Sequence, residues 1–378
     1  MTKKIAVLGS TGSVGTQTLD VIRQNQDKFE LSAVVAYANK TTLKGQKDEF
    51  NTPFAGLVDD TIAENDDFCY GESVLKQAVD LCDTVVVATR GIIALDAVIY
   101  AIKSGKTVAL ANKEVLVCAG ELISDALKQY GGKIIPVDSE HSALFQCGAN
   151  GKNVKKLILT ASGGAFWGKT KNQLKNVTPK QALNHPRWDM GKKITIDSAT
   201  LINKGFEVIE AAILFDKTPD DVQVVIHPQS YVHSMVEYTD GAVIAQIANT
   251  DMKLPISYAL SYPERVLDAV KPFDFSVEKR LDFLPADSDV LKGIQICRDA
   301  YAVGKNMPCV VCAADEVAVD YFLNGKISFL DIYDIIYDAC DYYINKLKDD
   351  KPNKDNIVKL FNEVKLFTKK SIEDKKCC

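Results

Sequence analysis

The chain has 378 residues, of which 47% are hydrophobic and 25% are charged, and its formal net charge is -5. This length predicts two or three domains, and the composition is typical of a globular protein. No apolar run of about 18 residues predicts a membrane span, and the acidic balance without a basic stripe argues against a nucleic-acid surface.

Residues 3–137 alternate short β-branched runs with longer amphipathic ones. The runs KIAVLGS, LSAVVAYA, TVVVAT, TVALAN and KIIPVDS predict strands of a parallel sheet with crossover helices. A strand beginning within the first ten residues leaves no room for a signal or transit peptide, so we expect a cytoplasmic location. The ten scattered cysteines are typical of reduced cytosolic thiols.

Glycines at 9, 12 and 15 directly follow the first strand and open a helix. A glycine pattern alone is weak evidence, and the alternative is a structural tight turn. In this context, however, a helix N-terminus can hold a pyrophosphate on its N–H groups, so we predict a dinucleotide site.

The second strand ends without the acid that usually holds the ribose of NAD. The segment offers Asn39, Lys40, Thr41 and Thr42 instead. Amide, hydroxyl and ammonium groups favour a 2'-phosphate, whereas a carboxylate would repel it. We therefore predict NADPH in preference to NADH.

Asp138 and Glu140 follow the apolar run KIIPV. On an extended strand they would share one face, at the end where open α/β sheets bind ligands. Capping or solvated acids are the usual explanation of an isolated pair of this kind. A third carboxylate, Glu207, is expected where the helix FEVIEAAILF starts. Three carboxylates without cysteine or paired histidine favour Mg²⁺ or Mn²⁺ over Zn²⁺.

Donors for a phosphate group lie close in sequence to these acids: Ser162, Ser198, Asn203 and Lys204. Each alone is an ordinary cap or turn residue, but together they suit a small phosphorylated polyol. The long polar segment between Ser162 and Ser198 contains His185, Trp188 and Met190 and predicts a lid. For His227 and His233 we favour structural or supporting roles.

The rest of the chain predicts a second α/β region and a helical end. KKLILTAS, KITIDSA, VQVVIHP and AVIAQIA are strand candidates, and four amphipathic helices follow residue 290. Cys309 and Cys312 form one C-x-x-C without the second pair of a zinc ribbon, and Cys377 and Cys378 are expected to be exposed. The predicted division is 1–137, 138–262 with a flap at 163–192, a linker at 263–290, and 291–378.

The motifs GSTGSVG, LANKE, PVDSEHSA, SGGAF, HPRWDMGKKITIDSATLINKGFE and IHPQSYVHSM, in this order and spacing, resemble the 1-deoxy-D-xylulose 5-phosphate reductoisomerase family. The resemblance implies an α/β fold with a Rossmann-like NADPH domain, a connective catalytic domain and a C-terminal helical bundle, in a homodimer. It runs nearly the full length, more loosely after residue 290.

The resemblance also implies site residues. Asp138, Glu140 and Glu207 match metal ligands that also belong to the catalytic set with Lys113 and His185. Substrate contacts are implied for Lys113, Ser139, Glu140, Ser162, His185, Trp188, Ser198, Asn203, Lys204 and Glu207. Coenzyme contacts are implied for Gly9, Thr11, Gly12, Ser13, Val14, Asn39, Lys40, Asn112, Glu114, Met190 and Gly191, and Trp188 and Met190 match the flap.

The chain departs from the family pattern in places. Tyr37 and Ala38 replace a glycine and a basic residue, so the 2'-phosphate contact is expected to pass to Lys40. GIIALDAV lacks a usual glycine and proline, and Ala165 stands where many members have proline.

The implied reaction rearranges 1-deoxy-D-xylulose 5-phosphate, then reduces the aldehyde with NADPH to 2-C-methyl-D-erythritol 4-phosphate for isoprenoid precursors. Two rivals stay open on the residues alone. One is a metal-free dehydrogenase acting on a semialdehyde, with His185 as acid and base. The other is a non-catalytic NADPH-sensing regulator.

Overall fold

The structure is a computed structural model that describes residues 2–188, 190–266, 269–277, 279–286, 288–347 and 352–376. Cys377 and Cys378 lie outside the described residues. The chain forms two compact units, each described here by itself: unit 1 comprises Met1–Val115, Ile123–Ser142 and Asp251–Pro272, and unit 2 comprises Leu116–Leu122, Ala143–Thr250 and Phe273–Cys378. The four-part division drawn from the sequence stays a prediction.

Unit 1 contains a seven-stranded sheet in the order β4-β3-β2-β1-β5-β6-β7, with every pair of neighbours parallel. Its strands are β1 (Lys3–Leu8), β2 (Phe29–Ala36), β3 (Phe54–Leu57), β4 (Cys69–Tyr70), β5 (Thr84–Val87), β6 (Thr107–Leu110) and β7 (Lys133–Pro136). All four residues of β5 are buried, as expected for a parallel sheet covered on both faces. The predicted parallel sheet is confirmed, whereas β3 and β4 were not predicted.

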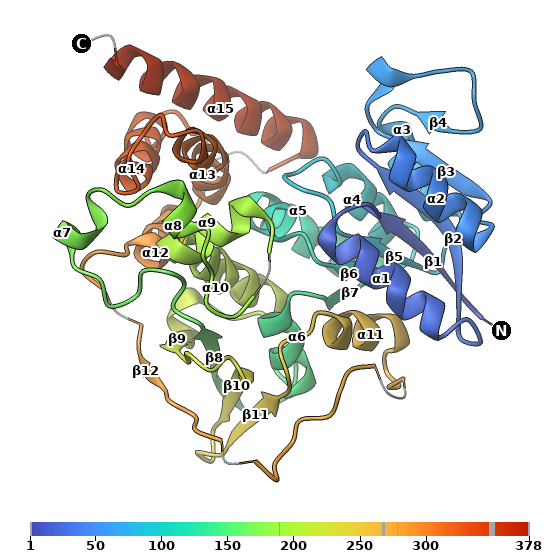
Figure 1. The fold of residues 1–378 in the computed structure, drawn as a ribbon, viewed down its shortest axis with the longest axis horizontal. Helices are drawn as coiled ribbons and strands as arrows, with labels where there is room; N and C mark the ends of the chain where they lie inside the picture. The colour runs from blue at the N-terminus through green and yellow to red at the C-terminus, as the bar shows by residue number, and fades with distance from the viewer. Residues whose placement is uncertain are drawn as a thin grey trace. The chain divides into compact units, whose positions relative to one another are not determined.

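Helices cover this sheet (Figure 1). They are α1 (Ser13–Gln24), α2 (Lys40–Phe50), α3 (Ser73–Asp80), α4 (Leu95–Lys103), α5 (Lys113–Tyr130) and α11 (Lys253–Ser261), with a 3-10 turn η1 (Asp60–Ile62). Helix α6 (Ser139–Gln146) follows β7, and its Leu144 packs in the core of unit 2. Within the unit α1 packs against α11, and α3 packs against α4. Residues of α5 and α6 divide between the two units.

Unit 2 contains a five-stranded sheet in the order β11-β10-β8-β9-β12. Its strands are β8 (Val154–Ala161), β9 (Val222–Ile226), β10 (Val232–Tyr238), β11 (Val243–Ile247) and β12 (Leu284–Pro285). Only β8 and β9 pair in parallel; the other pairs are antiparallel. The apolar face of α10 (Ile202–Leu214) packs on this sheet through Val208, Ala211 and Phe215.

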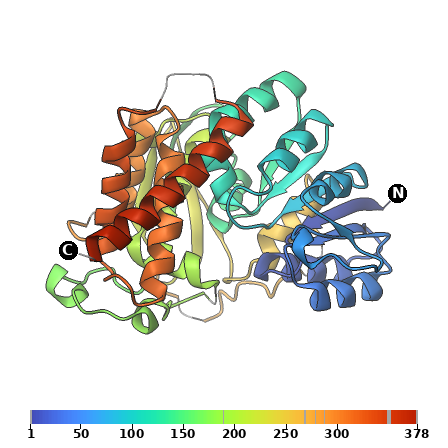
Figure 2. The same ribbon diagram turned by 90° about the horizontal axis from the view of Figure 1, so that it is seen from above.

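The helices after residue 290 agree with the prediction. They are α12 (Gly293–Val303), α13 (Met307–Leu323), α14 (Asp331–Tyr343) and α15 (Lys354–Lys376). Most residues of α13 are buried, because it packs against α12, α14 and α15 (Figure 2). No disulfide joins the described cysteines, and no described group of metal-capable side chains includes Cys309 or Cys312.

The expected conformation was wrong for two segments. The run KITIDSA is helix α9 (Lys192–Thr200) rather than a strand, because its buried residues Thr195, Ile196, Ala199 and Thr200 recur at helical spacing. Glu140 lies in the first turn of α6 rather than on an extended strand. β10, in the segment SYVHSM, was not predicted. The short helices α7 (Lys171–Leu174), α8 (Pro179–Ala182) and η2 (Pro219–Asp221) complete the unit.

Candidate functional site

The coenzyme loop joins β1 to α1. Thr11 lies in the loop, and Ser13 and Val14 open the helix, whose N-cap Gly12 supplies no side-chain cap. A Cβ at Gly9, where φ is +87°, would lie 2.4 Å from the carbonyl oxygen of Ala88. The N-terminal N–H groups of α1 are therefore presented on a backbone cradle that only glycine allows, which suits a pyrophosphate.

A residue that sequence reasoning missed holds this loop. Gln46 on α2 accepts a hydrogen bond from Ser10 Oγ at 2.7 Å and donates to the Ser10 carbonyl at 3.0 Å. Gln46 is buried, and its signal in the sequence is a polar residue on the apolar side of a helix. The bond ties the loop to α2 within unit 1.

Asn112 caps α5 and is buried. Its Oδ1 accepts from Val115 N at 2.9 Å, and its Nδ2 donates to the carbonyls of Thr89 and Gly91, both at 2.8 Å. The predicted coenzyme residue therefore positions the loop after β5. Glu114, also predicted to contact coenzyme, is half-buried in the first turn of α5.

Unit 1 brings together four predicted residues at the end of β7. Lys113 Nζ lies 2.9 Å from Asp138 Oδ2, with side-chain exposures of 8% and 14%. Ser139 Oγ donates to Glu140 Oε2 at 2.5 Å, and Glu140 N donates to Asp138 Oδ1 at 3.3 Å. His141, fully buried, has Nδ1 3.7 Å from Asp138 Oδ1. The two acids meet around a helix N-terminus, where the dipole favours negative charge.

A second group of predicted residues lies on α10 in unit 2. The helix begins at Ile202, so Glu207 lies within its second turn and not at its start. Asn203 Nδ2 donates to Glu207 Oε1 at 2.6 Å, and Lys204 forms an ion pair with Glu207 Oε2. Residues three and four apart share a helix face, and Glu207 is 1% exposed. Glu210, three residues later on α10, is also buried.

The predicted phosphate residues Ser162 and Ser198 lie near each other in unit 2. Gly164, where φ is +62°, packs so closely that a Cβ would lie 2.5 Å from the carbonyl oxygen of Ser198. Ser162 Oγ lies 3.0 Å from His185 Nε2. Because His185 Nδ1 accepts from the backbone N–H groups of Arg187 and Trp188, the ring proton is on Nε2 and donates to Ser162.

The predicted flap leads from this point into α9. The rings of Trp188 and His233 lie 6.1 Å apart between centroids, and Met190 and Gly191 precede α9, whose N-cap is Gly191. His227 is structural: its Nδ1 bonds the carbonyl of Asp282 at 2.8 Å and its Nε2 accepts from Tyr231 N at 3.1 Å.

A buried charge cluster that the sequence did not reveal anchors α9 to α13. Lys193 Nζ lies 2.6 Å from Asp197 and 2.7 Å from Asp315. Asp315 is fully buried, and this burial raises the pKa of its carboxyl. The cluster holds the helix that carries Ser198.

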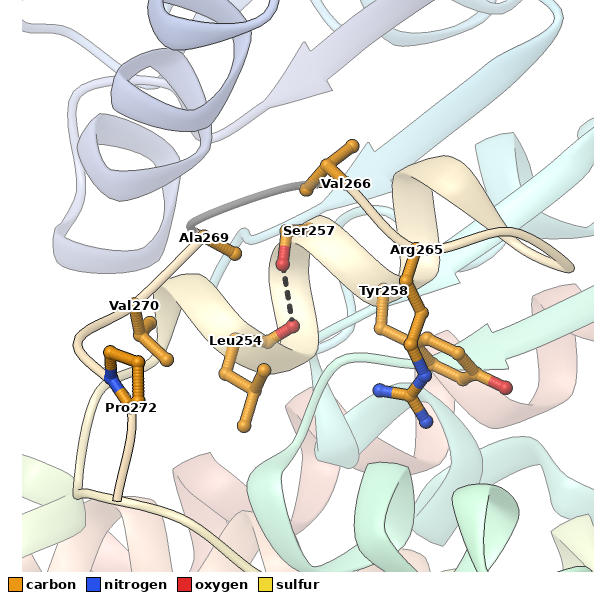
Figure 3. A pocket seen from close by; sticks show the side chains of 8 residues that line it. All are labelled: Leu254, Ser257, Tyr258, Arg265, Val266, Ala269, Val270 and Pro272. Carbon is orange, nitrogen blue, oxygen red and sulfur yellow. Dashed lines mark hydrogen bonds between the residues drawn. The ribbon is translucent and has the colours of Figure 1, made fainter. Parts of the chain in front are cut away.

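A small pocket of about 200 Å³ lies apart from the predicted residues (Figure 3). It is lined by residues of α11 and of the following segment, and the Arg265 guanidinium lies 4.5 Å from the centre of the Tyr258 ring. No predicted site residue lines it. No helix of the described residues is apolar over a length that would cross a membrane.

Comparison with known proteins shows which family the chain belongs to. Family profiles match residues 5–120 as 1-deoxy-D-xylulose 5-phosphate reductoisomerase, 134–215 as its C-terminal domain, and 247–367 as DXP reductoisomerase C-terminal domain. A protein of that name from Thermoanaerobacter sp. (strain X514) is 47% identical over 375 residues, covering 96% of this chain and 97% of the relative. The chain belongs to the 1-deoxy-D-xylulose 5-phosphate reductoisomerase family.

Other members of the reductoisomerase family agree in sequence and structure. The Clostridium acetobutylicum protein is 46% identical, covering 98% of this chain and 99% of its own. The Zymomonas mobilis reductoisomerase, solved with NADPH, superposes with a TM-score of 0.90 at 36% identity over 99% and 100% of the two chains. A reductoisomerase solved with NADPH, fosmidomycin and magnesium gives 0.93 at 37% identity over 99% of each. The predicted family and fold class are confirmed.

Proposed function

We propose that this chain catalyses the NADPH- and divalent-metal-dependent isomerisation and reduction of 1-deoxy-D-xylulose 5-phosphate to 2-C-methyl-D-erythritol 4-phosphate, in non-mevalonate isoprenoid precursor synthesis. The observation that carries the proposal is family membership over nearly the whole length, with the motif carboxylates and phosphate donors all present. As a member of this family the chain is an NADP-dependent oxidoreductase.

NADPH fits the glycine cradle between β1 and α1. We propose pyrophosphate contacts at Gly9, Thr11, Gly12, Ser13 and Val14, which form the glycine loop and the start of α1, where no side chain caps the helix. Further coenzyme contacts are proposed at Asn39, Lys40, Asn112, Glu114, Met190 and Gly191.

We propose Asp138 and Glu140 of unit 1 and Glu207 of unit 2 as the ligands of a divalent cation, as the family resemblance implies. The donor set is all carboxylate oxygen, which suits Mg²⁺ and Mn²⁺. In each unit the ammonium group of a lysine forms an ion pair with one of these carboxylates: Lys113 with Asp138, and Lys204 with Glu207. A bound ion would polarise the ketone and hydroxyl oxygens of the substrate and lower the hydroxyl pKa, and NADPH would supply the hydride.

The chain's own residues hold the substrate. Lys113, released from Asp138, can donate to a substrate oxygen, and Ser139 lies beside it. Lys204, released from Glu207, can join Ser162, Ser198 and Asn203 at the phosphate. Ser162 Oγ already accepts from His185 and Gly164 N, so its proton is available to a phosphate oxygen.

The flap excludes water from the reacting fragment. Trp188 and Met190 lie on a segment that His185 ties to Ser162, so phosphate binding at Ser162 is coupled to flap position. Remote binding energy at the phosphate would then favour closure over the bound sugar.

We also propose that the chain forms a homodimer and acts in the cytoplasm. Family resemblance supports a homodimer, which light scattering on the purified chain would test. The absence of disulfides among the described cysteines, several of them buried, is consistent with a reducing, cytoplasmic compartment, which fractionation would test.

The deciding experiment follows NADPH absorbance with 1-deoxy-D-xylulose 5-phosphate, with and without Mg²⁺ or Mn²⁺. We expect oxidation of NADPH that requires both the sugar phosphate and the ion. Full activity after exhaustive chelation would instead support a metal-free dehydrogenase. Binding of NADPH without any ketose-phosphate-dependent oxidation would support a sensor.

A further inference from the structure

A strongly acidic loop follows β3 at the coenzyme edge of unit 1. Residues 59–67 read DDTIAENDD and contain no basic residue. Asp59 N donates to the carbonyl of Tyr37 at 2.9 Å, and Val58 N donates to that of Ala36 at 3.0 Å. The loop is therefore fixed beside the carboxyl end of β2, the end that meets the coenzyme ribose in this class of fold.

The loop engages Lys40, the first residue of α2. Lys40 Nζ lies 2.5 Å from Asp66 Oδ2 and also forms an ion pair with Glu64. Hydrogen bonding to these acids, first to Asp66, raises the pKa of Lys40. The lysine is therefore charged, but two carboxylates already balance its charge.

Asp66 is held in place by further contacts, whereas the Glu64 side chain is 70% exposed and contacts Lys40. Asp66 accepts from the Tyr70 hydroxyl at 2.9 Å and from Phe68 N at 3.0 Å. The Lys47 ammonium on α2 donates to the carbonyl of Asp67 at 3.1 Å and lies 5.6 Å from the centre of the Phe68 ring. These contacts tie the loop to α2. Movement of Lys40 away from Glu64 and Asp66 is therefore opposed by their electrostatic attraction.

The net charge around Lys40 affects the binding of only one part of the coenzyme, the 2'-phosphate of NADPH. A phosphate monoester carries a charge of about -1.5 to -2 at neutral pH. Lys40 alone would present one positive charge to it, whereas Lys40 with Glu64 and Asp66 presents a net charge of -1. NADH lacks this phosphate and does not meet the repulsion.

We propose that Glu64 and Asp66 determine the coenzyme preference of this chain by holding Lys40, so that NADPH is favoured over NADH less than a freely available lysine would allow. The proposal rests on the coenzyme site of the proposed function. It assigns a specificity role to two acids that lie 24 and 26 residues after the lysine.

The test measures coenzyme affinity rather than turnover. NADPH and NADH are titrated by fluorescence into the full chain at fixed ionic strength, with wild type and the Glu64→Gln/Asp66→Asn double variant. We expect the NADPH Kd to fall about five- to tenfold and the NADH Kd to stay within about twofold. Lys40→Met should weaken NADPH binding more in the double-variant background than in wild type.

Two control variants each remove one negative charge other than those of Glu64 and Asp66. They are Asp60→Asn, in the same loop, and Glu30→Gln, at the opposite end of β2. Both should leave the ratio of the two Kd values within about twofold of wild type. An unchanged ratio in the double variant, or weaker NADPH binding, overturns the proposal; the latter would mean that the acids orient Lys40 for the phosphate. Failure of wild type to bind NADPH would instead refute the proposed coenzyme site.

Discussion

The ammonium nitrogen of Lys113 lies 2.9 Å from Oδ2 of Asp138. Their strands explain the meeting: β6 and β7 are parallel neighbours in the register Leu110↔Pro136, so the residues just after each strand reach the same edge. Because both side chains are largely buried, the attraction between their charges is screened less by salt than in a surface ion pair. A cation bound at Asp138, as proposed above, would compete with this lysine for the carboxylate and would leave its ammonium group available to the substrate.

Replacing Lys113 tests this competition. Lys113→Met should tighten Mn²⁺ binding to the substrate-free protein about tenfold, because the carboxylate loses its competing cation, and should lower kcat at least about a hundredfold. Calorimetric titration with Mn²⁺ and steady-state kinetics measure the two effects. Lys106→Met, which removes a lysine bonded to the Cys82 carbonyl, should change neither. Unaltered Mn²⁺ affinity in Lys113→Met would show that lysine and ion do not compete.

Glu207→Gln tests the third proposed ligand. The amide keeps the shape of the side chain but removes its charge, so kcat should fall at least about a thousandfold while the NADPH Kd stays within about twofold. Glu210→Gln, one turn later on α10, should have a smaller effect. Turnover near wild type at saturating Mg²⁺ or Mn²⁺ would remove Glu207 from the ligand set.

Ser162→Ala tests the phosphate contact. Losing one hydroxyl donor should raise the KM for 1-deoxy-D-xylulose 5-phosphate about ten- to a hundredfold, with the KM for NADPH nearly unchanged. Ser276→Ala, at an exposed serine bonded to Asp274, is the matched control. Equal changes in both KM values would place Ser162 outside the phosphate site.

Gly205 tests the packing that places Glu207. A Cβ there would lie 2.6 Å from Cys297 Sγ and 2.6 Å from the carbonyl oxygen of Gly293. Gly205→Ala should lower stability by about 1–3 kcal/mol, because α10 cannot approach α12 as closely. Gly45→Ala, where nothing lies within 4 Å of the new atom, should instead stabilise α2 by about 0.5–1 kcal/mol. Thermal unfolding distinguishes the two, and equal melting temperatures would contradict the packing argument.

The neutral His227 predicts a pH dependence of stability. Burial is the main cause that lowers its pKa from the ordinary 6.5, and both ring nitrogens are engaged as a neutral imidazole. The unfolded chain therefore takes up the proton first, so the stabilisation is complete above about pH 6.5 and is lost as the pH falls through the lower folded pKa. The His227→Asn variant should be less stable than wild type at pH 7, and its melting temperature should fall less than that of wild type between pH 7 and pH 5. Parallel curves for the two proteins would contradict the assignment.

The sequence by itself predicted most of the helices and strands and the chemistry expected of the site. Glycines after the first strand predicted the coenzyme cradle, apolar periodicity predicted α12 to α15, and the acids and hydroxyls predicted an oxygen-rich metal and phosphate site. These features are local, because the spacing of residues along the chain decides the face on which they lie.

Only the tertiary structure decided the remaining relationships. The β-branched run at 194–196 predicts a strand, yet burial and the Lys193 to Asp197 ion pair make it a helix. Lys193 meets Asp315 across 122 residues, and Lys40 meets Glu64 across 24. Charge partners of this kind depend on which surfaces pack together, and no local pattern encodes that choice, because the desolvation and pairing energies arise only once distant segments are in contact.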